Sequence, residues 1–557
     1  MRTAVAPDPD GGAMLCRLRA DGTPQGAPWH AADLPAEMAV LERSPAGPPR
    51  WVWAATSEIY PSLLRRGTPR LGRCHDVALV EALLLAHQGR SGEARSLGAA
   101  WARLHGRSVP DDPVSQVGSS PQEALFEPDR SALPAGTDHL AALVEVHADQ
   151  QRRIAALARP DRFALLAAVE SAGALAAAEM AFDGVPWRAD VHDRLLTEQL
   201  GPRPHAGARP EVLADLAEQI SAAFGRTVNP DSPAQLLRAF AAAGHSLPST
   251  RSWVLKGVDH PAVPLLLRYK ELSRLFSANG WTWLDTWVRD GRFRPDYVVG
   301  GVVSGRWATR GGGALQIPRA IRRAVTADPG WTLVAADAGQ LEPRVLAALS
   351  GDHGLAAAAA GGDLYARLAG AFGGDRDRAK IAVLAAMYGQ TGGDAAPLLR
   401  VMRRAFPQAM RHVDAAARAG EEGRLVRSLL GRTCPPPSAK WRRIVAEEPD
   451  SEAARRAARE RGRFTRNFVI QATAAEWALV LMAAVRRRIG AEESTRDTVR
   501  LVFFQHDELV LHTPRPLAGK VVEMLGDAEA ETRRTLFGET DVRFPLDVSV
   551  VECYADA

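Results

Sequence analysis

Residues 332–350 read TLVAADAGQLEPRVLAALS, an apolar run followed at once by a helical pattern. The apolar run predicts a buried strand that delivers Asp337 at its end. Far downstream, residues 499–514 read VRLVFFQHDELVLHTP, two apolar strands around the polar tip 505–508. This pattern predicts a β-hairpin that presents Asp507. We therefore expect one sheet to carry two strand-end carboxylates.

Two such carboxylates are suited to holding divalent metal ions. Mg²⁺ binds well to carboxylates together with substrate phosphates. Two ions about 4 Å apart would activate an attacking oxygen and stabilise a leaving one in phosphoryl transfer. For each segment alone there is a structural alternative, in which Asp337 caps the next helix and residues 506–508 form a solvated turn. The two segments together favour the metal site.

Between them, residues 375–393 read DRDRAKIAVLAAMYGQTGG and predict a cationic helix. Arg376, Lys380, Leu384 and Tyr388 recur every four positions, so they form a stripe about 18 Å long on one face. Helix-end amides and two cations would bind a triphosphate at its start, and the tyrosine suits a base or sugar. The alternative is an amphipathic helix with basic residues in water. Because only five of the 69 basic residues are Lys, the choice of Lys380 favours the phosphate site.

The rest of the chain falls into stretches of different pattern. Residues 1–110 alternate strand-like and helical pieces, as small α/β domains do. Residues 109–136 are rich in Pro, Ser and Gly and predict a linker. Residues 138–290 are almost wholly helical in pattern. Strand signals return from Tyr297 and enclose a helical stretch at about 351–480.

Composition excludes several protein classes. The 557 residues are 46% hydrophobic and 24% charged, which is typical of a soluble, multidomain chain. Four scattered cysteines without a CxxC pair indicate neither a disulfide framework nor a zinc site, and a reducing cytoplasm fits them. The most apolar run, 163–182, carries Glu170 and Glu179 and predicts a core helix rather than a membrane span. A pI of about 9.0 is compatible with a polyanionic partner.

The quoted segments resemble the motifs of the family A DNA polymerases, the DNA polymerase I type. DAGQLEPR (337–344) resembles the first motif, RDRAKIAVLAAMYG (376–389) the second and HDE (506–508) the third. SGRWATRGGGALQIP (304–318) resembles the TGRLSS…LQNIP element, and RFTRNFVIQATAAEW (463–477) resembles the RxxxNxPIQGTAAD helix. Five elements in the right order cover 297–557, and a weaker match runs through 160–290.

The resemblance implies an α+β multidomain fold shaped as a right hand, with an antiparallel-sheet palm and helical fingers and thumb. The thumb would span 138–290, the palm 291–350 and 465–557, and the fingers 351–464. Residues 1–137 would form an α/β ribonuclease H-like domain of the 3′→5′ exonuclease type with its linker. We expect no 5′-nuclease domain in a chain of this length.

The resemblance also implies a set of site residues. Asp337 and Asp507 would hold two Mg²⁺ ions, with Mn²⁺ as an alternative, and Lys380 would join them in catalysis. The dNTP would be bound by Arg376, Lys380, Tyr388, Glu342, Gln340, Leu384 and Tyr365. Primer-template DNA would be bound by Arg306, Arg310, Arg463, Asn467, Gln471 and His506. Arg306, Arg463, Asn467 and Gln471 would reach the minor groove, where contacts are nearly independent of sequence, and Arg310 would contact a phosphate.

Glu342 bears on the choice of nucleotide. In DNA polymerases of this family the glutamate at this place blocks a ribose 2′-OH, the one group that separates the two nucleotide classes. We therefore expect dNTP over NTP. Other positions depart from the family: Leu384 replaces an aromatic residue, Tyr365 replaces a phosphate-binding His, and Ala338 and Pro343 replace Tyr and Leu. With a shortened connection before the cationic helix, these changes predict a slow enzyme.

The N-terminal domain lacks the acids that proofreading needs. The strand at 13–18, taken as the first, has no Asp-x-Glu, and the nearest acidic pair, Asp8 and Asp10, lies in a Pro-broken tail. Glu58 is the only acid in the second expected position, and His147 takes the place of the last aspartate. We predict that proofreading is absent.

Three functions are retained at this point. The leading one is a template-directed DNA polymerase without proofreading, acting in repair or gap filling. The second is a bifunctional polymerase and 3′→5′ exonuclease, and the third is an inactive DNA-binding pseudo-polymerase. For the leading function we expect a monomer without membrane contact in a bacterial cytoplasm, associated with the nucleoid.

Overall fold

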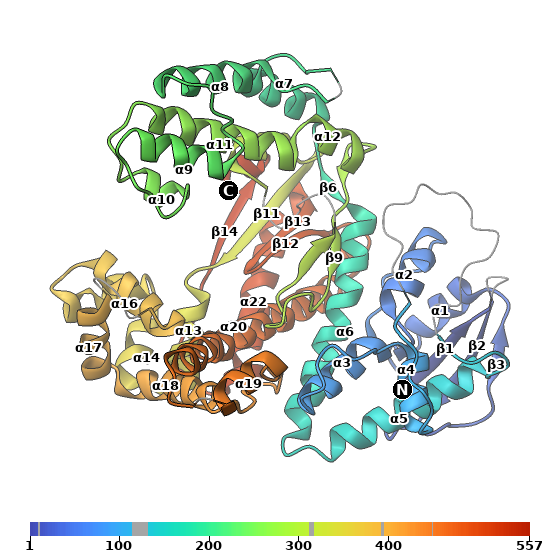
Figure 1. Ribbon diagram of the computed structural model, residues 1–557. Helices are drawn as coiled ribbons and strands as arrows, with labels where there is room; N and C mark the ends of the chain where they lie inside the picture. Colours follow the sequence, from blue (N-terminus) through green and yellow to red (C-terminus); the bar gives the residue numbers. More distant parts are fainter. Residues whose placement is uncertain (9–11, 114–131, 206, 311–316, 391–394, 448) are drawn as a thin grey trace. The chain divides into compact units, whose positions relative to one another are not determined.

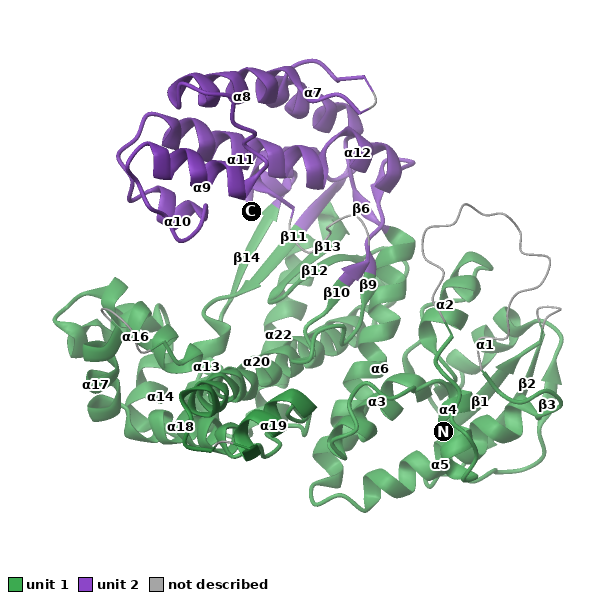
Figure 2. Cartoon of the chain, viewed as in Figure 1, with its two compact units in different colours: residues 1–183, 297–308, 334–550 green, residues 184–296, 309–333, 551–557 purple. Residues whose placement is uncertain are grey.

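The computed structural model describes residues 1–8, 12–113, 132–205, 207–310, 317–390, 395–447 and 449–557. The chain divides into two compact units (Figure 2). Unit 1 comprises residues 1–183, 297–308 and 334–550, and unit 2 comprises 184–296, 309–333 and 551–557. The helical stretch predicted at 138–290 is therefore divided at residue 183: its first two helices belong to unit 1 and the others to unit 2.

The N-terminal part of unit 1 is built on a five-stranded sheet (Figure 1), whose order is β3-β2-β1-β4-β5. Strand β1 is antiparallel to β2 and parallel to β4, which is parallel to β5. The strands are β1 (Arg2–Pro7), β2 (Ala13–Leu18), β3 (Trp29–Ala31), β4 (Arg50–Trp53) and β5 (Arg73–Asp76). The strand at 13–18 is thus the second, not the first as predicted, because the short run RTAVAP before it carries too weak an apolar signal.

Helices cover both faces of this sheet, and alternation along the strands divides the core in two. Ala4 and Val52 face one cluster with Leu143 of α5, whereas Val5 and Trp51 face the other. The helices of this part are α1 (Leu34–Glu42), α2 (Thr56–Arg65), α3 (Val77–His87), α4 (Leu97–Leu104), α5 (His139–Ala155) and α6 (Pro160–Asp183).

A second sheet in unit 1 has the order β12-β13-β11-β14. It is formed by β11 (Trp331–Ala338), β12 (Arg500–Gln505), β13 (Glu508–Pro514) and β14 (Leu546–Val551), although the first three residues of β11 are assigned to unit 2. Strands β12 and β13 form the predicted hairpin, with Gln505 paired to Glu508 across a two-residue turn. Helix α6 packs against β12, and α20 (Glu452–Ala491) packs against both α6 and α22 (Ala518–Phe537).

A helical part follows β11. It comprises α13 (Leu341–Ser350), α14 (His353–Ala359), α15 (Leu364–Leu368), α16 (Arg376–Tyr388), α17 (Ala395–Ala405), α18 (Pro407–Glu421) and α19 (Ala439–Glu447), with α21 (Glu493–Arg496) after α20. Helix α18 lies close along α20, where Thr465 Oγ1 donates to the carbonyl of Ala416 at 2.8 Å. A Cβ at Gly420 would overlap Thr465, so glycine permits this close approach. The predicted cationic helix is α16, which packs against α17 and α20.

Unit 2 is mainly helical. Its helices are α7 (Ala189–Leu200), α8 (Glu211–Ala223), α9 (Pro233–Ala242), α10 (Ser252–Leu255), α11 (Ala262–Asn279) and α12 (Trp281–Trp287). A small sheet of order β6-β8-β7 joins Val185–Pro186, Arg292–Phe293 and Val288–Arg289. Trp187, Trp283 and Phe293 pack together at its core, with ring centroids 4.9–5.6 Å apart.

Two helices of unit 1 are long and apolar enough to cross a membrane by length and composition, α6 and α20. Within their most apolar windows, 72% of α6 and 89% of α20 are buried inside the protein. Burial of this extent is typical of core helices in a folded domain. The predicted core helix at 163–182 is therefore observed as the central part of α6.

Candidate active site

The two strand-end carboxylates lie side by side at one end of the second sheet. Asp337 is near the end of β11, and Asp507 lies in the turn between β12 and β13. The backbone N–H of Ala338 donates to the Asp507 carbonyl at 3.1 Å, which holds the turn against β11. Burial, and then the charges of Asp507 and Asp547, raise the pKa of Asp337 to about 6. The structure therefore brings together the two acids that the sequence predicts.

Asp547 is an acid that sequence reasoning missed. Strand β14 lies beside β11, and the N–H of Gly339 donates to the Pro545 carbonyl at 3.2 Å. Because Thr332 bonds to the Val551 carbonyl further along, β14 runs antiparallel to β11 and Asp547 lies opposite Asp337. A lone acid within the strand pattern LDVSVV is the signal that points to it.

The hairpin turn has a constrained backbone. His506 has a φ of 57°, in the left-handed region that few side chains adopt. Burial raises the pKa of Asp507, although the charge of Arg306 acts in the opposite direction. Burial and Arg306 also lower the pKa of His506, which favours the neutral imidazole. Arg306 thus lies near enough to affect both turn residues.

Glu342, in the first turn of α13, accepts two hydrogen bonds. Arg306 Nη2 donates to Glu342 Oε1 at 2.6 Å, and the Tyr388 hydroxyl donates to Glu342 Oε2 at 2.8 Å. Tyr388 also shares a hydrogen bond with Gln471 of α20. The Glu342 side chain is only 12% exposed. These bonds fix its carboxylate and tie the C-terminal end of α16 to the segment after β11.

The N-terminal end of α16 is tied to the same segment through Asp363. Arg376 Nε donates to Asp363 Oδ2 at 2.6 Å, and Gln340 Nε2 donates to Asp363 Oδ1 at 2.7 Å. Although burial alone would raise it, these hydrogen bonds lower the pKa of Asp363 to about 2. Asp363 was not predicted; its place before α15, where it accepts from the amides of Tyr365 and Ala366, is a capping signal.

Helix α16 has the predicted stripe. Arg376 and Lys380 are exposed, and Leu384 and Tyr388 are partly buried. The intervening apolar positions are buried except for Ile381, which is 45% exposed. Among the described residues, no carboxylate lies within ion-pair distance of Lys380. One expectation is wrong, because the helix-end amides are not free for a ligand. The Asp375 side chain accepts from the amides of residues 377 and 378.

Two predicted nucleotide-binding residues occupy structural positions. Gln340 Oε1 accepts from the amide of Leu364 at 2.9 Å while its Nε2 binds Asp363, so both ends of its amide are engaged. Tyr365 is 6% exposed, and the Arg376 guanidinium lies 5.7 Å from its ring centroid. The Tyr365 ring is therefore buried against the Arg376 guanidinium and does not project into solvent.

The predicted DNA-binding residues lie in both units of the chain. Arg463, Asn467 and Gln471 lie at four-residue intervals on α20, in unit 1 together with Arg306 and His506. Asn467 Oδ1 is buried without a partner among the described residues. Arg310 ends β10 (Ala308–Arg310) in unit 2, and the glycine loop after it lies outside the described residues.

The acids at the end of the second sheet fit hard cations. Within the described residues, no group of three or more His, Cys, Asp or Glu side chains converges on a single point. Asp507 and Asp547 nevertheless lie near enough to Asp337 for their charges to add to the effect of burial on its pKa. Carboxylates are the ligands that suit Mg²⁺ or Mn²⁺ rather than a thiolate-binding metal.

Among its described residues, the N-terminal sheet has no comparable group of acids at its strand ends. Strand β1 contains no carboxylate, and His147 is buried with neither ring nitrogen partnered among the described residues. Its ring packs edge-on against His75, 4.5 Å between centroids. Asp149 is paired with Arg152 and Arg153, at 3.0 and 3.3 Å. Asp10 lies outside the described residues.

Comparison with known proteins agrees with these observations. DNA polymerase I of Chloroflexus aurantiacus is 30% identical over 323 residues, which cover 52% of this chain and 32% of that protein. The thermostable DNA polymerase I of Thermus aquaticus is 29% identical over 337 residues, covering 54% of this chain and 37% of that protein. The matched region is thus about a third of the full length of each of these relatives.

A solved structure resembles the whole chain. It is the POL domain of Pol1 from M. smegmatis in complex with DNA primer-template and dNTP, with a TM-score of 0.71 and 20% identity. The match covers 100% of this chain and 96% of that one, which establishes the fold. Residues 209–553 match the family model for DNA polymerase family A, and this match includes both acids and α16. The chain therefore belongs to DNA polymerase family A.

Proposed function

We propose that the protein is a template-directed DNA polymerase that adds dNTPs to a primer 3′-OH. One observation carries this proposal: α16 is bonded at both ends to the segment that follows the carboxylate Asp337. Glu342 holds Tyr388 at one end, and Asp363 joins Gln340 to Arg376 at the other. The cationic stripe is thereby kept beside a pair of acids, an arrangement that suits transfer of a nucleotidyl group.

The acids supply the reaction with its negative charge. Asp337 and Asp507 would hold two Mg²⁺ ions, with Asp547 adding charge from the neighbouring strand. Bound there, the ions would lower the pKa of the primer hydroxyl and stabilise the leaving pyrophosphate. The protein contributes position: the Ala338 to Asp507 hydrogen bond fixes the distance between the strands that carry these acids.

Helix α16 would bind the triphosphate. Lys380 has no carboxylate partner among the described residues and offers a compact charge to the phosphates. Arg376 is paired with Asp363, so its binding to a phosphate requires exchange of one anion for another. Tyr388 would lie beside the nascent base pair. Leu384 completes the stripe on α16, and the buried Tyr365 of α15 packs against Arg376; neither offers a charge of its own.

Glu342 would select the sugar. Its carboxylate is fixed by Arg306 and Tyr388, so a ribose 2′-OH arriving there would meet a group that cannot easily move. We propose preference for dNTP over NTP on this ground. Arg463, Asn467, Gln471 and His506, with Arg310 in unit 2, would bind the primer-template.

We propose that the second sheet is the palm, that residues 351–464 are the fingers, and that unit 2 includes the thumb. For the N-terminal sheet, the order β3-β2-β1-β4-β5 supports a ribonuclease H-like domain. With no acid on β1 and a buried His147, we propose that this domain has no 3′→5′ exonuclease activity. A monomer in the bacterial cytoplasm, acting in repair or gap filling, fits this reading.

Primer extension tests the function. The wild-type chain should extend a primer on a DNA template with dNTPs and Mg²⁺, and Asp507→Ala should not. Arg65→Gln, an exposed position on α2, is the control for handling and folding. Failure of the folded wild-type chain to extend any primer, while still binding duplex DNA, would favour the pseudo-polymerase instead.

A further inference from the structure

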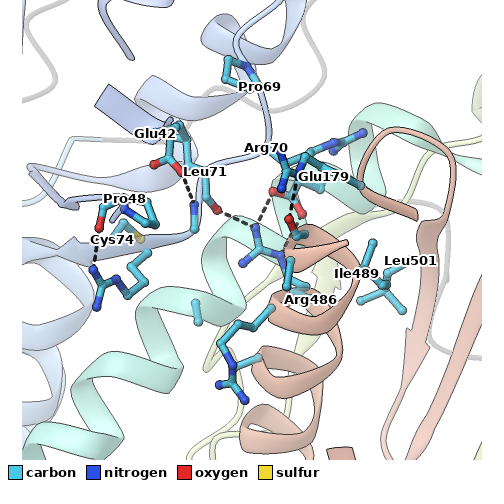
Figure 3. Close-up of a pocket in the computed structure, with 18 of the residues that line it drawn as sticks. Glu42, Pro48, Pro69, Arg70, Leu71, Cys74, Glu179, Arg486, Ile489 and Leu501 are labelled. Carbon is cyan, nitrogen blue, oxygen red and sulfur yellow. Dashed lines mark hydrogen bonds and ion pairs between the residues drawn. The ribbon is translucent and has the colours of Figure 1, made fainter. Parts of the chain in front are cut away.

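A cavity of about 910 Å³ lies in unit 1, apart from the turn that carries Asp507. One wall is formed by the segment after α1 and the starts of β4 and β5. The other is formed by α6, the C-terminal part of α20 and the start of β12 (Figure 3). No residue of the acid-bearing turns at 337–342 and 505–508 is among those that line it. Nothing in the proposed polymerase mechanism uses this cavity.

The lining is strongly cationic. Eight arginines line the cavity, against four carboxylates. Some of these charges neutralise one another. Arg486 Nε donates to Glu179 Oε2 at 2.8 Å (Figure 3). Arg70 pairs with Asp183 at 2.5 Å. The first pair joins α20 to α6, and the second joins the segment before β5 to α6. We therefore assign a structural role to these charges.

Four other arginines lack such partners. Among the described residues, no carboxylate lies within ion-pair distance of Arg43, Arg50, Arg73 or Arg496. Arg50 Nη1 donates to the Cys74 carbonyl at 3.0 Å, and Arg73 Nη2 donates to the Pro48 carbonyl at 2.5 Å. Each guanidinium has five N–H donors, so most of their donor capacity remains unused.

Two of these arginines are held close together by the sheet. In the parallel pair β4 and β5, Arg50 is the direct neighbour of Arg73. Like charges in such positions are unfavourable, and burial together with Arg73 lowers the pKa of Arg50. The chain is rich in arginine, but this pair is fixed by strand register, which sets the exposed Arg73 directly beside the partly buried Arg50. An anion would relieve the repulsion.

We propose that this cavity binds a ligand that carries two or more closely spaced phosphoryl groups. Guanidinium groups bind phosphate oxygens through paired N–H donors, and arginines stand on both walls. The cavity volume falls within the range of small-molecule sites, so the ligand is of nucleotide size. A free nucleotide and the end of a single DNA strand share this chemistry.

Binding of inorganic tripolyphosphate tests the site. Isothermal titration without divalent ions should give one site in the full wild-type chain, weakened at least 10-fold in Arg43→Gln/Arg73→Gln. Both positions are exposed, so the fold should persist. Arg65→Gln/Arg226→Gln, an exposed pair with the same loss of charge, should bind as the wild type does. Tripolyphosphate should also raise the melting temperature of the wild type more than that of the cavity variant.

Lys380→Ala separates the cavity from α16. The proposal is overturned if Lys380→Ala abolishes binding while Arg43→Gln/Arg73→Gln does not, or if the two double variants bind equally. Titration with dATP and with a five-residue oligo-dT then identifies the source. The proposal is supported if dATP or oligo-dT binds the wild type more tightly than tripolyphosphate does and this binding is lost in Arg43→Gln/Arg73→Gln. It is overturned if the cavity variant still binds both ligands as the wild type does. Primer extension is measured separately, so failure here leaves the polymerase proposal intact.

Discussion

The two sheets of unit 1 differ in the acidic residues that lie at the ends of their strands. The sheet β12-β13-β11-β14 presents Asp337, Asp507 and Asp547 where its strands end, and burial, followed by the charges of the other two acids, raises the pKa of Asp337 to about 6. The sheet β3-β2-β1-β4-β5 presents no acid on β1, and His147 lies buried in the adjoining core. Burial lowers the pKa of His147 well below its usual value, so it is neutral.

The difference teaches that strand order alone does not carry phosphoryl-transfer chemistry. Both sheets are packed against helices, but in the second sheet Asp507 and Asp547 lie close enough to Asp337 to raise its pKa beyond the effect of burial alone. In the first sheet, the described buried acids are engaged: Asp76 accepts from the amides of Thr56 and Leu79, and Glu81 pairs with Arg103 and Arg153. His147 is buried without a partner among the described residues, which costs stability without offering a ligand set.

Substitution of Asp507 is the strongest test of the difference between the two sheets. Asp507→Ala should reduce primer extension by roughly 10³-fold, because loss of one preorganised charge removes transition-state stabilisation of this order. Single-turnover extension measures the loss, and circular dichroism checks that the hairpin still folds. An activity within tenfold of the wild type would mean that the second sheet carries no more chemistry than the first.

Removal of the other central acid should stabilise the fold. The pKa of Asp337 is raised to about 6 from an ordinary value near 3.8, so the folded wild type loses stability as pH rises through 6. Asp337→Asn should therefore be more stable at pH 7.5 by roughly 1 kcal/mol, a value reduced for solvent screening. The gain should shrink as the pH falls from 6 towards 3.8 and vanish at about pH 2.5, where the wild-type carboxyl is protonated in both states. Urea unfolding at the two pH values checks the sign, and equal stabilities at pH 7.5 would contradict it.

The next test concerns selection of the sugar by Glu342, which follows β11 of the second sheet. Glu342→Ala should reduce the preference for dNTP over NTP by roughly tenfold or more, because the 2′-OH would no longer meet a fixed carboxylate. The ratio of kcat/KM values for the two nucleotides measures this preference. Tyr388→Phe keeps the carboxylate and its Arg306 partner but removes one hydrogen bond, so its effect should be several-fold at most. A larger effect from Tyr388→Phe than from Glu342→Ala would place discrimination elsewhere.

The ion pair at the start of α16 should have a smaller effect. Asp363→Asn keeps a capping side chain for α15 but removes the anion that competes with phosphate for Arg376. We expect KM for dNTP to fall two- to fivefold with little change in kcat. Steady-state extension measures both constants, and Asp541→Asn, an exposed position with no ion pair among the described residues, is the control. A rise in KM would show that Asp363 orients Arg376 for binding.

The first sheet should show no effect at all. A primer with a mispaired 3′ nucleotide should keep that nucleotide when incubated with Mg²⁺ and without dNTPs. Glu58→Gln and Asp149→Asn should leave this result unchanged. Excision that depends on either residue would remove the contrast between the two sheets and support the bifunctional enzyme.

The sequence by itself determined the elements with long, local signals. The apolar run before Asp337, the two strands around residues 506–508 and the four-residue spacing of α16 all depend on periodicity within one segment, and each was observed as predicted. The short strand β1 was missed, since six residues with little apolar contrast carry too weak a signal.

Only the tertiary structure decided which groups are already engaged. Asp375 occupies the first amides of α16, Gln340 binds Asp363, and Asp547 lies opposite Asp337. These contacts join residues from different elements, so no local pattern contains them. They depend on strand register and on the packing of α16, because a side chain's charge and availability are set by whichever distant segment folds against it.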